Sequence, residues 1–315
     1  MDLVPLSEVS SRALRPLLLE ESQHWGQELH WDFGEVASAV ESGLDRQALF
    51  GRVAREGGRP LAYCYYMIDG GRAIVGSLYA ALGHRDRGLE EVLLDAVLAD
   101  AQARPGHERV ECQTLFSTAP EADHRFTRAG FKSRLRHYLL RRLDPLSVPA
   151  PNGYRLRAVR RDDLPAVADL IHRSHRGSLD AALNVTYATP ALCRGFVDTL
   201  VLRSGCGRFS AEASILAEGP GGLLGVILAS ELSRTNGHIC QVSVEPSRQS
   251  RGLGSLLLVS SLEAMRRASL QTASLSVTVD NGRAYEIYMR LGFALRKEFA
   301  AHAWARPPAR IELPA

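Results

Sequence analysis

The sequence of 315 residues lacks the features typical of secreted, metal-binding and membrane-spanning proteins. Its five cysteines are odd in number and form no C-x-x-C pair, which argues against a disulfide framework and a zinc site. No apolar run approaches the roughly 18 residues that a membrane-spanning helix needs. The N-terminus has no basic region followed by an apolar core. We therefore expect a soluble, cytoplasmic protein with no metal and no membrane partner.

An excess of charge of one sign is also missing. The formal net charge is +3, and the arginine pairs are scattered and not interleaved with aromatic residues. This pattern favours a solvated surface, so we expect no nucleic-acid partner. With 45% apolar and 23% charged residues, the composition is that of a globular protein, and the chain is long enough for two domains with separate cores.

Proline gathers near the middle of the chain. Residues 143–153 read Leu-Asp-Pro-Leu-Ser-Val-Pro-Ala-Pro-Asn-Gly, and each proline fixes φ, removes a backbone donor and disfavours helix in the residue before it. Residues 154–159 then alternate like a new first strand. We predict a linker at 146–152 between a domain at 1–145 and a second domain at 153–315.

The second half predicts helices and strands in mixed order. Helices are expected at 162–176, at 190–202, from Gly252 and from Arg283 to Gly292. Strands are expected at 213–217, 223–230, 238–244 and 274–279, followed by a final strand pair within 293–304. Strand 274–279 alternates apolar and hydroxyl side chains, so one of its faces is polar. This order indicates an α/β or α+β sheet domain.

One segment has the pattern of an anion-binding loop. Residues 242–254, Val-Ser-Val-Glu-Pro-Ser-Arg-Gln-Ser-Arg-Gly-Leu-Gly, run from a strand through a proline turn and two glycines into a helix N-terminus. Unpaired N–H groups and the helix dipole attract an anion there, and glycine lets a phosphate approach the backbone closely. Taken alone, the segment fits a tight turn without a ligand better.

A second segment removes most of that ambiguity. Residues 281–293, Asn-Gly-Arg-Ala-Tyr-Glu-Ile-Tyr-Met-Arg-Leu-Gly-Phe, directly follow the alternating strand, and together the two segments resemble the GNAT N-acetyltransferase family. The residues similar to that family are Gln249, Gly252 and Gly254 in its pyrophosphate loop, and Asn281, Ala284, Tyr288, Gly292 and Phe293 in its last helix. The resemblance covers about residues 153–305, and the order and separation of the two motifs agree as well. It implies a mixed, mostly antiparallel twisted sheet flanked by helices.

The resemblance also implies an activity and a site. The activity is acetyl transfer from acetyl-CoA to a primary amine of a small-molecule or peptide acceptor by direct attack in a ternary complex. Strand 240–244 would splay from strand 274–279, and an N–H around 242–244 would polarise the thioester carbonyl. Arg251 would add positive charge near phosphate. Tyr288 would protonate the departing thiolate, and its alternative reading is a core tyrosine. The implied contacts with acetyl-CoA are Val242, Ser243, Val244, Gln249, Ser250, Arg251, Gly252, Leu253, Gly254, Ser255, Asn281 and Tyr288.

The base and the acceptor surface are less defined. An alkylammonium has a pKa near 10, so a base should assist its deprotonation. His238, where some branches of the family carry a glutamate base, and Glu231 are the candidates; a turn histidine and a solvated carboxylate are the alternatives. The acceptor is expected to bind around 174–202 and 232–237. Polar side chains there that specify no particular amine are His172, His175, Asp180 and Tyr187.

The first half resembles a degenerate copy of the same unit. Strands are suggested at 61–68 and 72–82. Gly88 precedes an amphipathic helix as Gly252 does, and Gly130 parallels Gly292, with offsets of 164 and 162 residues. The substitutions that separate the two copies are Glu90 for Gly254, Phe126 for Tyr288 and Ala119 for Asn281. We therefore expect the first half not to catalyse acyl transfer; an unrelated domain is the alternative.

Three functions are compatible with these patterns. The first is a tandem GNAT-type N-acetyltransferase, and the second is a non-catalytic acyl-CoA-binding sensor. The third is an aminoacyl transferase built from paired GNAT-like domains, which the intact CoA loop argues against because such enzymes use aminoacyl-tRNA. Tyr288 lies in the copy that keeps the glycines, and this favours the enzyme. The acceptor, the acyl chain length and the oligomeric state are left open.

Overall fold

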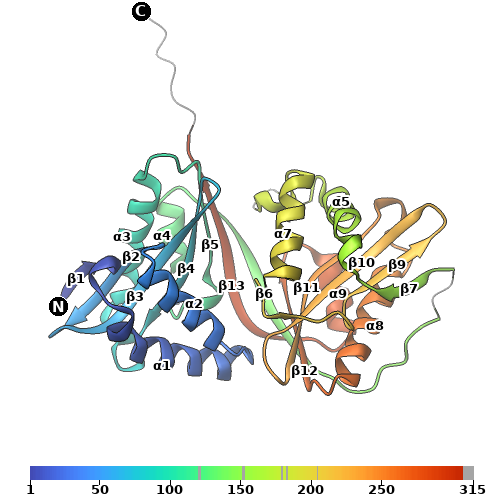
Figure 1. Ribbon diagram of the computed structural model, residues 1–315, viewed down its shortest axis with the longest axis horizontal. Coiled ribbons are helices and arrows are strands. Elements are labelled where there is room, and N and C mark those ends of the chain that lie inside the picture. Colours follow the sequence, from blue (N-terminus) through green and yellow to red (C-terminus); the bar gives the residue numbers. More distant parts are fainter. Residues whose placement is uncertain (120–121, 151–152, 179, 182–183, 204, 308–315) are drawn as a thin grey trace, which may run out of the picture. The chain divides into compact units, whose positions relative to one another are not determined.

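The chain forms two compact units in a computed structural model (Figure 1). The structure describes residues 1–307 apart from 120–121, 151–152, 179, 182–183 and 204. Unit 1 contains Met1–Gly26, Phe33–Arg134 and Phe299–Ala315, and unit 2 contains Gln27–Asp32 and Leu135–Glu298. Each unit therefore combines segments from both halves of the sequence. Within the described residues, no helix is both long and apolar enough to cross a bilayer.

Unit 1 is a mixed sheet with helices against it. Its strands are β1 (Asp2–Pro5), β2 (Leu49–Glu56), β3 (Arg59–Asp69), β4 (Arg72–Ala80), β5 (Arg109–Gln113) and the end of β13 (Ala294–Ala305), paired in that order. Its helices are α1 (Ser11–Leu29), α2 (Gly34–Asp45), α3 (Leu89–Ala103) and α4 (Ala122–Arg128), with short 3-10 turns at Leu6–Glu8, Leu82–Arg87 and Thr114–Phe116. Neighbouring strands are antiparallel except β4 and β5, which are parallel.

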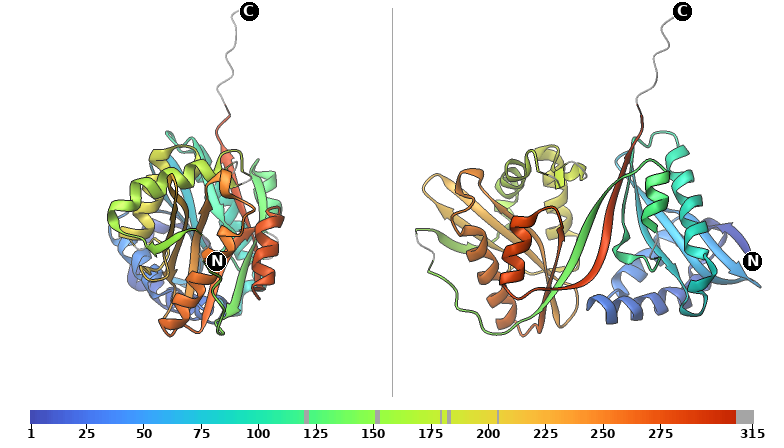
Figure 2. Two further views of the ribbon diagram at one scale, coloured as in Figure 1. Left: turned by 90° about the vertical axis from the view of Figure 1, so that its right-hand side faces the viewer. Right: turned by 180° about the vertical axis from the view of Figure 1, so that it is seen from behind.

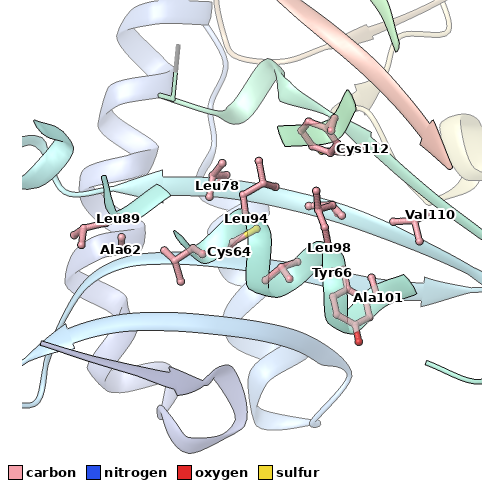
Figure 3. Close-up of a cluster of buried hydrophobic side chains, with 14 of the residues drawn as sticks. Ala62, Cys64, Tyr66, Leu78, Leu89, Leu94, Leu98, Ala101, Val110 and Cys112 are labelled. Carbon is pink, nitrogen blue, oxygen red and sulfur yellow. The ribbon is translucent and has the colours of Figure 1, made fainter. Parts of the chain in front are cut away.

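The core of unit 1 lies between α3 and the strands. Leu94 and Leu98, one helical turn apart on α3, are buried together with Cys64 and Tyr66 of β3 (Figure 3). Side chains four residues apart share one face of a helix, so the apolar spacing in the sequence directs this face onto the sheet.

Unit 2 repeats this plan. Its strands are β6 (Lys132–Arg142, from Leu135), β12 (Thr272–Thr278), β11 (Asn236–Val244), β10 (Gly222–Glu231), β9 (Ile215–Gly219) and β7 (Arg155–Ala158), in that spatial order, with β8 (Arg208–Phe209) paired to β10. Its helices are α5 (Leu164–His175), α7 (Pro190–Leu202), α8 (Leu253–Arg267) and α9 (Gly282–Arg290), with 3-10 turns at Arg161–Asp163, Val185–Tyr187 and Pro246–Arg248. Here the parallel pair is β11 with β12.

The sheet of unit 2 has a different pair of helices on each face. Val226 and Leu228 of β10 are buried with α5 and α7, whereas Ile227 between them is buried with α8. Successive residues of a strand point to opposite faces, so this alternation assigns α5 and α7 to one face and α8 and α9 to the other. The left-hand view of Figure 2 shows the two helix pairs on opposite sides of the strands.

The repeat predicted from the glycine offsets is present in the fold. The parallel pairs begin at Arg72 in unit 1 and at Asn236 in unit 2, which are 164 residues apart, the same separation as Gly88 and Gly252. Both pairs extend over four residues before the strands diverge. The mixed, mostly antiparallel sheets expected from the sequence are confirmed.

The two units exchange their last strands, which the sequence did not indicate. β6 precedes the proline-rich segment but pairs with β12 in unit 2, from Arg136↔Thr278 to Arg142↔Thr272. The end of β13 returns to unit 1 and pairs with β5, from Ala301↔Gln113 to Ala305↔Arg109. The right-hand view of Figure 2 shows β6 in green and β13 in red. The compact units therefore differ from the predicted boundaries at 145 and 153, because linker composition says nothing about which sheet a flanking strand joins.

The C-terminal strand and the linker also differ from what the sequence predicts or lie partly outside the described residues. The predicted strand pair within 293–304 is instead a single strand, β13, whose residues up to Glu298 belong to unit 2 and whose residues from Phe299 belong to unit 1. Residues 151–152 of the predicted linker lie outside the described residues.

A short segment of the first half also belongs to unit 2. Asp32 N donates to the carbonyl of Leu232 at 2.7 Å, and the hydroxyl of Tyr138 donates to the carbonyl of Leu29 at 2.9 Å. The ring of Trp31 lies 6.0 Å from that of His238. The first half thus supplies an aromatic side chain beside one of the predicted site residues.

Candidate active site

The strands β11 and β12 separate inside unit 2. They pair only from Asn236↔Thr272 to Ile239↔Leu275. On the other side of β11, Leu228 of β10 faces Gln241 and Ala229 faces Ile239, so Cys240 is an extra, bulged residue. A bulge bends its strand and increases the local twist, which turns the end of β11 away from β12. The predicted splay of 240–244 from 274–279 is thus present, and its cause is the bulge.

The glycine loop follows β11 directly. Ser250 and Gly252 both have left-handed backbone conformations, with φ of 65° and 82°, and Gly252 caps the N-terminus of α8. No side chain of the N-cap residue bonds the first turn of α8. A Cβ at Gly254 would meet Cγ2 of Val244 at 3.8 Å and nothing closer. The positive end of the helix dipole and free space beside Gly254 therefore occur together here.

The α9 helix places two predicted residues. Asn281 is its N-cap, and its side-chain oxygen accepts from the N–H of Ala284 at 3.4 Å. Tyr288 is half-buried, with its ring edge-on to Phe293 at 6.0 Å. Burial, and then the negative charge of Asp180, raise the pKa of Tyr288 to about 12. The phenol is therefore protonated at neutral pH, as a general acid must be.

Polar side chains line the β11 side of the gap on the face that carries α5 and α7. Gln241 accepts a hydrogen bond from the hydroxyl of Tyr187 at 3.1 Å, and its amide nitrogen lies 3.3 Å from Nε2 of His175. The rings of His175 and Tyr187 are stacked 4.1 Å apart. Burial lowers the pKa of His175, so its imidazole is neutral at pH 7.

The β12 side carries a carboxylate. Thr278, buried at the end of β12, donates its hydroxyl to Oδ1 of Asp180 at 2.6 Å. The negative charge of Asp180 acts to raise the pKa of Tyr288, and it partly offsets the lowering of the pKa of His175 by burial. Sequence reasoning noted Asp180 only as one polar residue of an acceptor surface. Thr278 and Asp180 are 98 residues apart, and no local pattern links them.

The two predicted base candidates have surroundings that differ from expectation. His238 is 6% exposed, with Nδ1 hydrogen-bonded to the Ser274 hydroxyl at 2.9 Å, and burial followed by the charge of Arg136 lowers its pKa to about 3. Glu231 forms an ion pair with Arg208. The surroundings of His238 are not those of a base tuned to neutral pH. Both assignments stay predictions. Among the described residues, no group of three or more His, Cys, Asp or Glu side chains is arranged to hold a metal ion.

The corresponding place in unit 1 is closed. β4 and β5 diverge after Val75↔Cys112, but a bridge between Leu78 and Ser117 joins the two segments again. Glu90, buried in the first turn of α3, accepts hydrogen bonds from the hydroxyl of Thr118 and from backbone N–H groups of Ala80 and Thr118. Burial raises the pKa of Glu90 to about 7. A protein carboxylate thus fills the place where unit 2 leaves space for an anion.

Comparison with known proteins places this geometry in a family. Residues 194–293 match the model of the acetyltransferase (GNAT) family. The chain is 31% identical over 227 residues to a protein named mycothiol acetyltransferase from Kineococcus radiotolerans, with 71% of this chain and 70% of the relative covered. Another protein of that name, from Acidimicrobium ferrooxidans, is 35% identical over 117 residues, or 36% of this chain and 38% of the relative.

The fold comparison extends the likeness to both units. A tandem GNAT protein from the clavulanic acid biosynthesis pathway superposes with a TM-score of 0.66 at 19% identity, covering 98% of this chain and 99% of that one. At this identity the likeness shows the fold, whereas the sequence relatives show the family. The chain belongs to the GNAT family of acetyl-CoA-dependent N-acetyltransferases, in the tandem arrangement.

Proposed function

We propose that this protein transfers an acetyl group from acetyl-CoA to a primary amine, and that unit 2 holds its one acyl-CoA site. One observation carries the proposal: the gap between β11 and β12 leads directly to the α8 N-terminus, whose N-cap is Gly252. In unit 1 the equivalent gap is bridged, and Glu90 fills the equivalent helix terminus. A pantetheine arm and its pyrophosphate therefore have a place to bind in one unit only.

The residues fit acetyl-CoA as follows. The backbone amides of 249–254 hold the pyrophosphate, and Arg251 adds positive charge beside it. The edge of β11 beyond Ile239 pairs with the pantetheine arm, since no described strand pairs with that edge. An N–H in the segment 242–244 donates to the thioester carbonyl and stabilises the negative charge that develops on its oxygen.

The reaction is one displacement at the acetyl carbonyl. The amine nitrogen attacks the carbonyl carbon, a C–N bond forms, and the C–S bond then breaks with its electron pair remaining on sulfur. The attacking nitrogen loses one proton, and the departing sulfur gains one. No covalent enzyme intermediate is required, because the amine and the thioester meet in the same gap.

Tyr288 assists the departing sulfur. A thiol has an ordinary pKa of about 8.5, well below the pKa of about 12 that burial gives this phenol. Complete proton transfer from the phenol to the thiolate is therefore uphill in the cofactor-free protein. The phenol contributes a hydrogen bond that strengthens as negative charge develops on sulfur, and the two pKa values converge once CoA buries the thiolate beside it.

The names of the relatives suggest which class of acceptor amine to test first. They are named mycothiol acetyltransferases, and the product that such an enzyme releases carries an acetylated cysteine amine. The acceptor proposed here is a small molecule with a primary amine, and cysteinyl amides are the first class to test. The surface that receives it contains the ring pair His175 and Tyr187 on one side of the gap and Asp180 on the other.

The test combines binding with turnover. Calorimetric titration of the full chain with acetyl-CoA should give one site per chain. Release of free CoA thiol should then be followed with a panel of primary amines that includes S-methyl-L-cysteinamide, glucosamine and a lysyl peptide. Binding together with amine-dependent thiol release supports the enzyme. Binding without release for any amine identifies a sensor, and absence of binding overturns the proposal.

A further inference from the structure

A carboxylate lies at the gap where the amine and the thioester must meet. Asp180 is half-buried and is held by the Thr278 hydroxyl at 2.6 Å, at the end of β12 that has diverged from β11. Among the described residues, Asp180 forms no ion pair with arginine, lysine or histidine, although several other carboxylates of unit 2 do. Its negative charge is thus available to a cationic ligand.

The orientation of Asp180 follows from the pleat of β12. Leu275 and Val277 are buried in the cluster that contains α8, so the alternate residue Thr278 lies on the opposite face, with α5 and α7. Tyr288, on α9, reaches the gap from the α8 side. Asp180 and Tyr288 therefore approach the gap from opposite faces, and each is close enough to sense the other electrostatically.

We propose that Asp180 is the residue that binds the acceptor ammonium and positions its nitrogen for attack. This proposal rests on the proposed function and specifies the charge of the acceptor and the chemical groups next to its amine. An amine arrives at neutral pH as an ammonium, because its pKa is near 10, and it must release one proton to solvent before the nitrogen lone pair can attack. A carboxylate held by one hydrogen bond attracts that cation and aligns it, and it retains lone pairs with which to accept the N–H donors.

The same charge restricts the substrate class. A second carboxylate on the carbon next to the amine would lie close to Asp180 and would be repelled. The preferred acceptor is therefore a primary ammonium whose neighbouring groups are neutral, such as an aminoacyl amide or an amino sugar. A free α-amino acid is disfavoured.

The test uses two ligands that need no knowledge of the natural acceptor. S-(2-aminoethyl)-CoA carries an ammonium just beyond the sulfur, and S-propyl-CoA is its neutral isostere. Wild type should bind the ammonium analogue about tenfold more tightly, equivalent to about 1.4 kcal/mol. Asp180→Asn should bind S-propyl-CoA as wild type does and should lose the preference. Asp180→Glu should retain part of it.

A matched charge control is Asp162→Asn. Asp162 is exposed in the 3-10 turn that precedes α5, whereas His175 at the other end of α5 borders the gap. The 12 residues of α5 separate the two by about 18 Å, at about 1.5 Å per residue. This variant should keep the tenfold preference. Thermal unfolding of all variants should show the same midpoint within about two degrees.

The outcomes separate the two proposals. Failure of wild type to bind S-propyl-CoA would overturn the proposed function itself. Equal affinity of wild type for the two analogues, or a preference that survives Asp180→Asn, would overturn the role of Asp180 and leave the acyl-CoA site in place. If Asp162→Asn also abolished the preference for the ammonium analogue, the preference would come from the overall surface charge of the protein. That result would also overturn the proposed role of Asp180.

Discussion

Glu90 and Gly254 occupy the same position, the second residue of helices that each begin after a glycine in the left-handed conformation. The preceding glycines, Gly88 and Gly252, have φ of 66° and 82°. In α3 the side chain of Glu90 occupies the space at the helix N-terminus, where it accepts hydrogen bonds from Thr118 and from the backbone N–H of Ala80. In α8 the missing side chain leaves that space open. One residue thus distinguishes a self-filled helix terminus from an open one.

Gly254→Glu should abolish acetyl-CoA binding. The φ of Gly254 is not positive, and an added Cβ meets only Val244, so the fold accepts a side chain here. The carboxylate would repel the pyrophosphate and occupy its place. Gly254→Ala, which adds the Cβ without the charge, should weaken binding by less than about tenfold. Calorimetric titration measures both, and unimpaired binding by Gly254→Glu would remove the loop from the site.

Glu90→Gly should not create a second acyl-CoA site. The variant copies the glycine of unit 2, but the bridge from Leu78 to Ser117 still closes the gap in unit 1. Titration with acetyl-CoA should therefore give one site per chain, as for wild type. A second site would show that the carboxylate alone keeps unit 1 from binding, and that the bridge opens readily.

Tyr288→Phe should lower kcat by about 10²-fold and leave the affinity for acetyl-CoA within twofold. The substitution removes the hydroxyl that we propose to assist the departing sulfur, and the ring keeps its packing against Phe293. The measurement is single-turnover acetyl transfer, so that chemistry limits the rate. Tyr285→Phe is the control on the same helix, because the hydroxyl of Tyr285 bonds His137 instead. Equal rates for Tyr288→Phe and wild type would remove this phenol from the reaction.

Glu21 should make unit 1 less stable as the pH rises. It is fully buried beside Trp25 and Tyr63, which both donate to it, and burial raises its pKa to about 7 from 4.5. Between these values the folded state binds more protons than the unfolded state, so the free energy of unfolding falls with increasing pH. Glu21→Gln removes this contribution to the pH dependence of stability, because glutamine does not titrate.

The free energy of unfolding of Glu21→Gln is compared with that of wild type at several pH values. Relative to wild type, Glu21→Gln should gain on the order of 3 kcal/mol in urea unfolding between pH 4.5 and pH 8. Glu35→Gln, which changes an exposed carboxyl on α2, should show no such trend. A difference between Glu21→Gln and wild type that stays constant with pH would contradict the raised pKa.

The sequence was sufficient for the features that depend on local pattern. Gly252 and the alternating strand at 274–279 predict a strand, a loop and a helix in the right order, because backbone freedom and pleat are local properties. Cys240 was not recognisable as a bulge, since a bulge is defined by its partner strand. The low pKa of His238 was equally out of reach, because it depends on burial and on the charge of Arg136, 102 residues earlier in the chain.

The exchange of β6 and β13 has a consequence for how the chain folds during synthesis. Unit 1 lacks the strand beside β5 until the residues up to Ala305 have left the ribosome. The first unit to be translated is therefore the last to be completed, and the edge of β5 that pairs with β13 stays unpaired until then. Separating the gene at the proline-rich segment would give two fragments that each lack a strand of their own sheet. Mixed together, such fragments should complement one another and refold only as a pair.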